Sequence, residues 1–371
     1  MTDEADAAED SVTLTNTIEA ATLLLTCGPG GVGKTTTAAA VGVAAAERGR
    51  RVVVVTVDPA RRLADALGLD DGEATDEPHR VDDVGSDGGE LWALMLDDAA
   101  TFDRLVREQT STEEQADAIL NNPIYGALSR SLAGAQEYMA IERLHQLFTS
   151  DEWDLVIVDT PPSRSAIDLL GAPDRLVAFL SNPVYRTLTV GQRTFARVTN
   201  AASSMFLWAV RRLAGPQIVE DTVAFFRSLT TLEDGLRQRA DEVRQLLRAD
   251  ETAFVVVSSP RAEAIAESEH LVGALRDGDF PFSGVVINLI HPLPATLDPG
   301  DRAALDDVAD GPLADHLAWH DELVELARSE REELAGLAEL ADDVPVVELP
   351  LMDTDVHDVD GLGQLATQLA P

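Results

Sequence analysis

Short apolar runs recur along this chain of 371 residues, and stretches with helical character separate them. The runs are rich in valine and leucine and have the length of strands. They cover residues 21–27, 51–57, 91–96, 154–160, 253–258, 284–290 and 344–349. Strands that are apolar on both sides are typical of a parallel sheet with helices on its two faces. The pattern therefore predicts an α/β fold with a mostly parallel sheet flanked by helices.

Two long stretches, residues 99–149 and 174–250, lack the strand pattern. We expect both to be helical and to form a helical subdomain beside the sheet. No sequence repeat and no Pro- or Gly-rich linker interrupts the chain, so residues 14–371 are expected to form a single domain. Residues 1–13 are acidic and polar, which predicts a solvated N-terminal tail and not a secretory signal.

The charge balance narrows the possible partners and surroundings. The chain has 66 acidic and 28 basic residues and a net charge of −38. Because phosphate contacts in nucleic-acid binding come from clustered Lys and Arg, we expect no nucleic-acid partner. Abundant acid with one lysine indicates a halophilic protein, whose melting temperature should rise between dilute buffer and about 2 M KCl as repulsion is screened. No apolar run reaches membrane-spanning length, so a soluble, cytoplasmic protein is expected.

The one lysine, Lys34, lies in the segment GPGGVGKTT at residues 28–36, which fits the phosphate-loop pattern G-x-x-x-x-G-K-[ST]. An apolar strand precedes the segment and an Ala-rich helix follows it, as a P-loop NTPase requires. Glycines let successive backbone N–H groups and the helix N-terminus face the phosphates. We predict that a nucleotide binds at Gly28, Gly30, Gly31, Gly33, Lys34, Thr35 and Thr36, with Thr35 also holding Mg²⁺. The alternative is a glycine-rich turn that binds nothing.

Two carboxylates follow predicted strands, where the metal and the attacking water of a nucleotide site lie. Asp159 ends the run DLVIVDT and is predicted to hold Mg²⁺ directly or through water. Asp58 follows the run RVVVVTV and is predicted to orient water at the γ-phosphate. Together with Lys34 they form the predicted catalytic set. Either aspartate could instead cap a turn after its strand.

The number of lysines limits which nucleotide base the site could recognise. Guanine recognition in the switch GTPases uses Asn-Lys-x-Asp, and this chain has no second lysine for that motif. ATP is therefore favoured. Asn288, near the end of the run GVVINLI, is placed where an amide could read the adenine edge. A buried asparagine satisfied by backbone groups is the alternative.

Taken together, these segments resemble the ArsA-type ATPases, which include the arsenite-pump ATPase and the ATPase that guides tail-anchored membrane proteins. The resemblance runs through most of the chain, on residues 30–36, 58–60, 159–163, 286–288, 349–351 and 355–356. It implies a nucleotide-gated dimer in which Asp58 belongs to switch I and Asp159 opens switch II. It also implies an adenine pocket formed by Asn288 and the loop near Pro350.

One departure from the family concerns catalysis. Pro29 occupies the position of the family's signature lysine, which reaches the partner's nucleotide across the dimer. We hypothesise that Arg61, Arg62 or Arg164 replaces it, against the alternative that these arginines are surface charge. The predicted function is a Mg²⁺–ATP-driven dimeric switch. The alternative is a low-turnover nucleotide-binding subunit that forms a heterodimer with a lysine-bearing paralogue.

Other departures concern ligands and clients. Cys27 is the one cysteine, so the chain lacks a cysteine set for arsenite and a Cys-x-x-Cys pair for zinc. Residues 197–219 contain a single methionine, Met205, whereas a groove for a client's apolar helix is typically Met-rich. A membrane-protein client stays a candidate partner, and the sequence leaves open whether the helical subdomain exposes such a groove.

Overall fold

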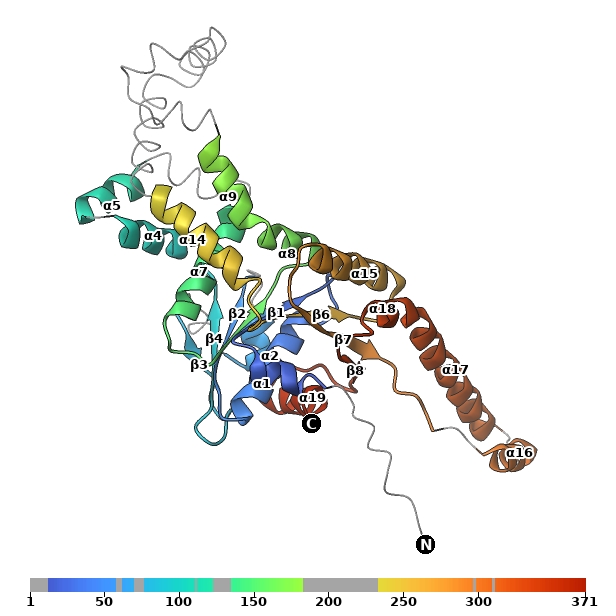
Figure 1. Ribbon diagram of the computed structural model, residues 1–371. Coiled ribbons are helices and arrows are strands. Elements are labelled where there is room, and N and C mark those ends of the chain that lie inside the picture. Colours follow the sequence, from blue (N-terminus) through green and yellow to red (C-terminus); the bar gives the residue numbers. More distant parts are fainter. Residues whose placement is uncertain are drawn as a thin grey trace.

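The computed structural model describes residues 13–57, 62–69, 77–110, 112–122, 135–182, 233–295, 298–308 and 311–371. Within these ranges one sheet has the strand order β3-β4-β2-β5-β1-β6-β7-β8 (Figure 1). The strands are β1 (Leu23–Cys27), β2 (Arg51–Thr56), β3 (His79–Arg80), β4 (Glu90–Met95), β5 (Leu155–Asp159), β6 (Thr252–Ser258), β7 (Phe282–Ile290) and β8 (Val346–Pro350). All neighbours pair in parallel except β3 and β4. The predicted mostly parallel sheet and the α/β fold class are confirmed.

Each of the seven apolar runs overlaps one of the parallel strands, with ends that differ by up to two residues. Strands buried on both faces read as continuous hydrophobic segments. β1, β5 and β6 are buried along their whole length. The two-residue β3 is the strand that the pattern missed. It is short, polar and antiparallel at the sheet edge, so it carries no apolar signal.

Four helices pack on one face of the sheet: α1 (Thr15–Ala20), α2 (Lys34–Glu47), α3 (Arg62–Leu67) and α19 (Val359–Leu369). α2 is rich in buried alanine, which lets its backbone lie close to the strands. Gly42 is the extreme case, since a Cβ there would lie 2.8 Å from Val54 Cγ2 and 2.9 Å from Leu91 Cδ1. Glycine in a helix costs about 1 kcal/mol relative to alanine, but here a larger residue would push α2 off the sheet.

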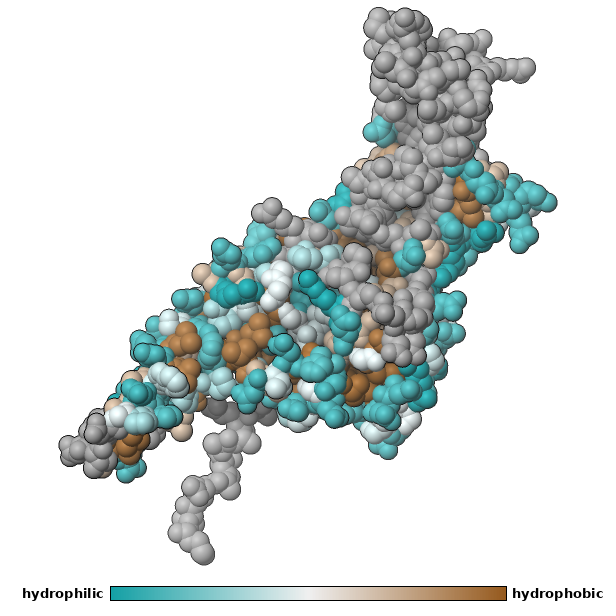
Figure 2. All heavy atoms as spheres, turned by 180° about the vertical axis from the view of Figure 1, so that it is seen from behind, coloured by the Kyte–Doolittle hydropathy of each residue, from teal (hydrophilic) through white to brown (hydrophobic). Residues whose placement is uncertain are grey.

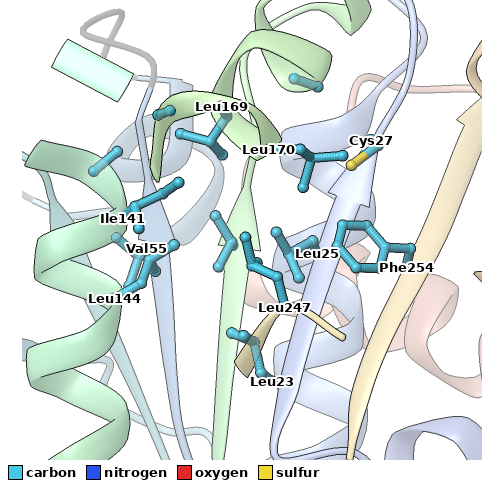
Figure 3. Packing of buried hydrophobic residues seen from close by; sticks show 14 of the residues in the cluster. Leu23, Leu25, Cys27, Val55, Ile141, Leu144, Leu169, Leu170, Leu247 and Phe254 are labelled. Carbon is cyan, nitrogen blue, oxygen red and sulfur yellow. The ribbon is translucent and has the colours of Figure 1, made fainter. Parts of the chain in front are cut away.

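The other face is covered by helices from distant parts of the chain. They are α4 (Asp98–Gln109), α5 (Glu113–Leu120), α7 (Ala135–Thr149), α8 (Ser163–Leu170), α9 (Ala172–Ser181), α14 (Glu233–Leu246), α15 (Ala262–Asp277) and α18 (Ala335–Leu340). Figure 3 shows Leu25 and Val55 of the sheet in this cluster, with Ile141 and Leu144 reaching it from α7. The described parts of the two predicted helical stretches are largely helical, and their separation as a subdomain stays a prediction. Met205 and the rest of residues 197–219 lie outside the described ranges.

Two further helices, α16 (Pro299–Val308) and α17 (Pro312–Glu333), extend away from the sheet beyond β8 (Figure 1). α17 exposes several large apolar side chains, of which Trp319 is 65% exposed. Seen from behind, the coloured surface is mainly hydrophilic, and hydrophobic residues form separate patches (Figure 2). None of the helices in the described ranges has both the length and the apolar character needed to cross a bilayer.

Candidate nucleotide site

The predicted phosphate loop connects β1 to α2 at the C-terminal edge of the sheet. Two of its glycines are required by close approach. A Cβ at Gly28 would lie 2.0 Å from the Val257 carbonyl oxygen of the neighbouring strand β6. At Gly33, where φ is +89°, a Cβ would lie 2.2 Å from Asn288 Nδ2. The sheet therefore fixes both ends of the loop, and only glycine fits there.

Lys34 is the first residue of α2, and its side chain turns back over the loop. Its ammonium donates to the Pro29 carbonyl oxygen at 2.8 Å, and the side chain is largely buried. The nitrogen is thus held inside the curl of the loop, where an anionic oxygen would compete with the carbonyl for it. Thr35 and Thr36 follow on the first turn of α2, at the positive end of the helix dipole.

Asp159 ends β5 and is 1% exposed. The Thr35 hydroxyl donates to Asp159 Oδ2 at 2.7 Å, and the Thr56 hydroxyl donates to the same oxygen at 3.0 Å. The contact joins the phosphate loop to two strands, because Thr56 is the β2 residue in register with Asp159. Thr56 was missed by the sequence reasoning. The available signal was its position at the end of a strand, but its neighbour depends on the strand order.

A cavity of about 630 Å³ opens at this edge of the sheet. It brings together the phosphate loop, Asp159, the start of α3 and the segment that precedes α19. The lining residues are Gly30, Gly31, Gly33, Lys34, Thr35, Thr36, Arg62, Asp65, Ala66, Asp159, Thr160, Pro162, Asp355, Val356 and His357. Most of the predicted phosphate and metal residues therefore face one space. Arg62 and the segment 355–357 add charged and polar groups to its wall.

Residues 21–299 match the ArsA ATPase family, described as anion-transporting ATPase, over well more than half of the chain. The chain belongs to this family. It is 24% identical over 361 residues to ATPase ASNA1 homolog 1 of Paramecium tetraurelia, covering 96% of this chain and 95% of that protein. It is 27% identical over 280 residues to ATPase GET3C of Arabidopsis thaliana, covering 71% and 66%. It is 26% identical over 287 residues to ATPase ARSA1 of Chlamydomonas reinhardtii, covering 72% and 34%. This ArsA family member is therefore an ATPase with a P-loop NTPase fold.

The two residues expected to form the adenine pocket, Asn288 and Pro350, are not among the residues that line the cavity. Asn288 is 6% exposed, and its amide nitrogen donates to the Val32 carbonyl oxygen at 2.9 Å. The following residue, Leu289, has φ of +63°, and the pairing of β7 with β8 shifts register between Ile287 and Ile290. The Asn288 amide of this ArsA family member thus holds the phosphate loop by donating to a backbone carbonyl. This contact is the alternative interpretation, a buried asparagine satisfied by a backbone group. Adenine recognition by Asn288 and by Pro350, at the end of β8, stays a prediction.

Of the predicted catalytic aspartate in switch I and the three candidate arginines, the structure places one residue. Asp58 and Arg61 lie outside the described ranges, and so does the side chain of Arg164. Arg62 begins α3 and lines the cavity, so it is the one of the three candidate arginines that can be placed.

Cys27, at the end of β1, is buried under this edge of the sheet. Burial raises the pKa of the Cys27 thiol to about 12, while the Thr160 side chain and the Lys34 ammonium act in the opposite direction. A thiol with such a pKa is a poor metal ligand and a poor nucleophile near neutral pH. Over the described ranges, no three His, Cys, Asp or Glu side chains are grouped closely enough to hold a metal ion.

Proposed function

We propose that this ATPase binds Mg²⁺–ATP in the cavity beside the phosphate loop and uses its hydrolysis to drive a dimeric switch. The observation that carries the proposal is the pair formed by the Thr35 hydroxyl and Asp159 Oδ2, 2.7 Å apart, beside the Lys34 ammonium in one cavity. A cation, a hydroxyl and a carboxylate at the N-terminus of a helix are the groups that triphosphate chemistry requires.

The phosphate-binding role rests on Lys34 and on the backbone of Gly30, Gly31 and Gly33. Lys34 donates to the Pro29 carbonyl oxygen, a neutral acceptor. A phosphate oxygen carries negative charge and makes a stronger, charge-assisted bond, so it would displace that carbonyl. The loop N–H groups and the first turn of α2, with Thr36, add donors around the same anion.

The chemistry of the donor set supports a magnesium site. Mg²⁺ prefers oxygen ligands and is held in nucleotide sites by a few protein oxygens plus phosphates. We assign Thr35 and Asp159 as its protein contacts. The Thr56 hydroxyl orients the Asp159 carboxylate through Oδ2. When bound, the ion would neutralise the negative charge that develops on the phosphoryl oxygens. We further assign Asp58, which follows β2, as the residue that orients the attacking water.

The decisive experiment is a calorimetric titration of Mg²⁺–ATP into the protein in concentrated KCl. We expect saturable binding, and no detectable binding for Lys34→Ala. Lys34→Arg should also bind poorly, because a planar guanidinium does not fit the narrow loop. Arg48→Ala is the matched control, since it removes a cation from the other end of α2. Absence of heat with the wild-type protein, or equal binding by Lys34→Ala, would refute the proposal.

Arg62 is our candidate to supply the positive charge that Pro29 removes, because it lines the cavity on the side of α3. Arg62→Ala should lower kcat about tenfold or more, which corresponds to about 1.4 kcal/mol of transition-state stabilisation. Arg61→Ala and Arg164→Ala are the comparisons. If all three variants hydrolyse ATP like the wild type, no arginine of this set replaces the lysine.

The partner of the switch is either a second copy of this chain or a paralogue that carries the lysine, and a membrane protein is the candidate client. Relatives named ASNA1 and GET3 ATPases support the candidate client at family level, and the homodimer and the heterodimer rest on the resemblance alone. Light scattering with a non-hydrolysable ATP analogue tests the homodimer. A monomer with negligible turnover, activated by a lysine-bearing paralogue, would select the heterodimer.

A further inference from the structure

Arg261 lies in the turn between β6 and α15 and touches the phosphate loop from outside the cavity lining. Its Nη2 donates to the carbonyl oxygens of Gly31 at 3.2 Å and of Gly30 at 3.5 Å. Its Nε donates to Ser259 Oγ at 3.1 Å, which fixes the direction of the guanidinium. β6 is the sheet neighbour of β1, so this turn and the phosphate loop leave the sheet side by side.

Four successive carbonyls of the loop accept hydrogen bonds from side chains. The Pro29 carbonyl accepts from Lys34, those of Gly30 and Gly31 from Arg261, and that of Val32 from Asn288. The first of these contacts involves the ammonium that a phosphate would recruit. The contacts made by Arg261 and Asn288 can persist when a ligand is present.

Because the peptide group is planar, a contact that fixes a carbonyl group also fixes the direction of the N–H group of the next residue. In a trans peptide, the C=O of one residue and the N–H of the next point in opposite directions. By holding the Gly30 and Gly31 carbonyls, Arg261 therefore turns the N–H groups of Gly31 and Val32 away from itself. Gly30 and Gly31 line the cavity, so those N–H groups are turned toward the space that would receive an anion.

The middle of the loop needs such a brace because close packing does not fix it there, in contrast to its two ends. Within the described part of the chain, a Cβ at Gly30 would meet no atom within 4 Å, so packing does not restrict the peptide there. Gly31 has φ of +73°, which only glycine adopts readily. Pro29 has no N–H group with which to anchor the preceding turn.

We propose that Arg261 is a positioning residue of the nucleotide site, which holds the phosphate loop so that its N–H groups converge on the phosphates. This inference rests on the proposed function. The guanidinium suits the task because its planar fork reaches two carbonyls and Ser259 at once. A lysine at this position has a single nitrogen and can replace only part of the contact.

The test compares Arg261→Ala with the wild type in concentrated KCl, where long-range charge effects are screened. We expect the dissociation constants of ADP and of Mg²⁺–ATP to rise together by about tenfold, and KM to rise with them. The kcat should change less than about twofold, because the N–H groups hold ground state and transition state alike. Arg261→Lys should lie between the two proteins. The matched control is Arg276→Ala at the other end of α15, which should bind like the wild type.

Each result has a distinct meaning. Unchanged ADP affinity in Arg261→Ala overturns the inference, and so does a loss of kcat without a loss of ADP affinity. If Arg261→Ala does not fold, Arg261→Lys decides by the same comparison of ADP affinity with kcat, and wild-type ADP affinity in that variant also overturns the inference. If the wild type itself binds no nucleotide, the proposed function has failed, which the same titration reports separately.

Discussion

Asp159, at the candidate nucleotide site, and Glu142, in the middle of α7, are both buried carboxylates, but their partners differ in kind. Asp159 accepts hydrogen bonds from the hydroxyls of Thr35 and Thr56. Glu142 is paired with the Arg239 guanidinium at 3.5 Å and accepts from the Tyr138 hydroxyl at 3.4 Å. A hydroxyl can rotate toward a new ligand at small cost, whereas separating a buried ion pair leaves an uncompensated charge. The hydroxyl partners of Asp159 can therefore be replaced by a ligand, whereas the ion pair of Glu142 is expected to stay intact in the folded protein.

The surroundings of Glu142 form what we call the ionic cluster: Glu108, Glu142, His145, Arg239 and Glu242. Arg239 Nη2 lies 3.6 Å from Glu108 Oε2, and its Nη1 donates to His145 Nδ1 at 2.7 Å. His145 Nε2 in turn lies 3.1 Å from Glu242 Oε2. The cluster joins α4, α7 and α14, which are far apart in the sequence. We therefore expect its members to contribute to stability, and the residues of the nucleotide site to contribute mainly to activity.

The largest expected effect is that of Arg239→Ala. Removing this guanidinium leaves Glu142 buried without its cation, which costs about 3–5 kcal/mol in comparable sites. Guanidinium chloride unfolding of the whole chain measures the loss. Arg237→Ala is the matched control on the same helix, since its ion pair with Glu233 is more exposed and should contribute about 1 kcal/mol or less. Equal losses in the two variants would contradict the proposed division between the regions.

Asp159→Asn should lower activity strongly and stability only slightly. If Asp159 contacts the metal, the neutral amide should lower kcat about 100-fold, or about 2.7 kcal/mol in the barrier. Stability should change less than in Arg239→Ala, because both hydroxyls can find another acceptor in the amide oxygen. The control is Asp154→Asn just before the same strand, where the carboxylate accepts from the Arg51 backbone N–H. A large loss of stability with normal turnover would assign Asp159 to the structure and not to the site.

The two regions also differ in how far the sequence predicted them. The phosphate loop and Asp159 were found because each occupies a fixed place next to a continuous apolar run. Thr56 and Arg261 were missed because their contacts depend on the order of strands, which local patterns do not report. The ionic cluster was missed for the same reason, since a charged residue on a helix ordinarily indicates a solvated face. The sequence left both interpretations of Asn288 open, because the irregular pairing of β7 with β8 around Leu289 has no signature in the sequence.

A smaller effect is expected from pH through His145. Burial, with the nearby Arg239 charge, lowers the pKa of His145 below its usual value of 6.5, against the opposing influence of Glu242. The unfolded chain therefore binds a proton first, and stability is lost as the pH falls through 6.5 and below. Burial raises the pKa of Glu142, whose contribution is instead lost as the pH rises.

The melting temperature of the wild type should therefore fall more than that of His145→Gln between about pH 8 and about pH 5.5. Glu142 is present in both proteins, so the difference isolates the histidine. Parallel pH profiles would mean that His145 is not held neutral by the ionic cluster. The turnover of the folded protein should show no matching difference, because His145 is not among the residues that line the cavity.

A last experiment tests whether the two regions open separately. Because burial raises the pKa of Cys27 to about 12, native protein at about pH 8 should resist alkylation by iodoacetamide, with only about one thiol in 10⁴ ionised. If modification requires global unfolding, Arg239→Ala should speed it by the same factor by which it raises the unfolded fraction, and Mg²⁺–ATP should slow it. If modification is faster than global unfolding allows and Arg239→Ala leaves it unchanged, the edge of the sheet that carries the phosphate loop opens while the helices of the ionic cluster, α4, α7 and α14, stay folded. The chain would then contain two cooperative units, with Asp159 in the unit that carries activity and Glu142 in the unit that contributes most to stability.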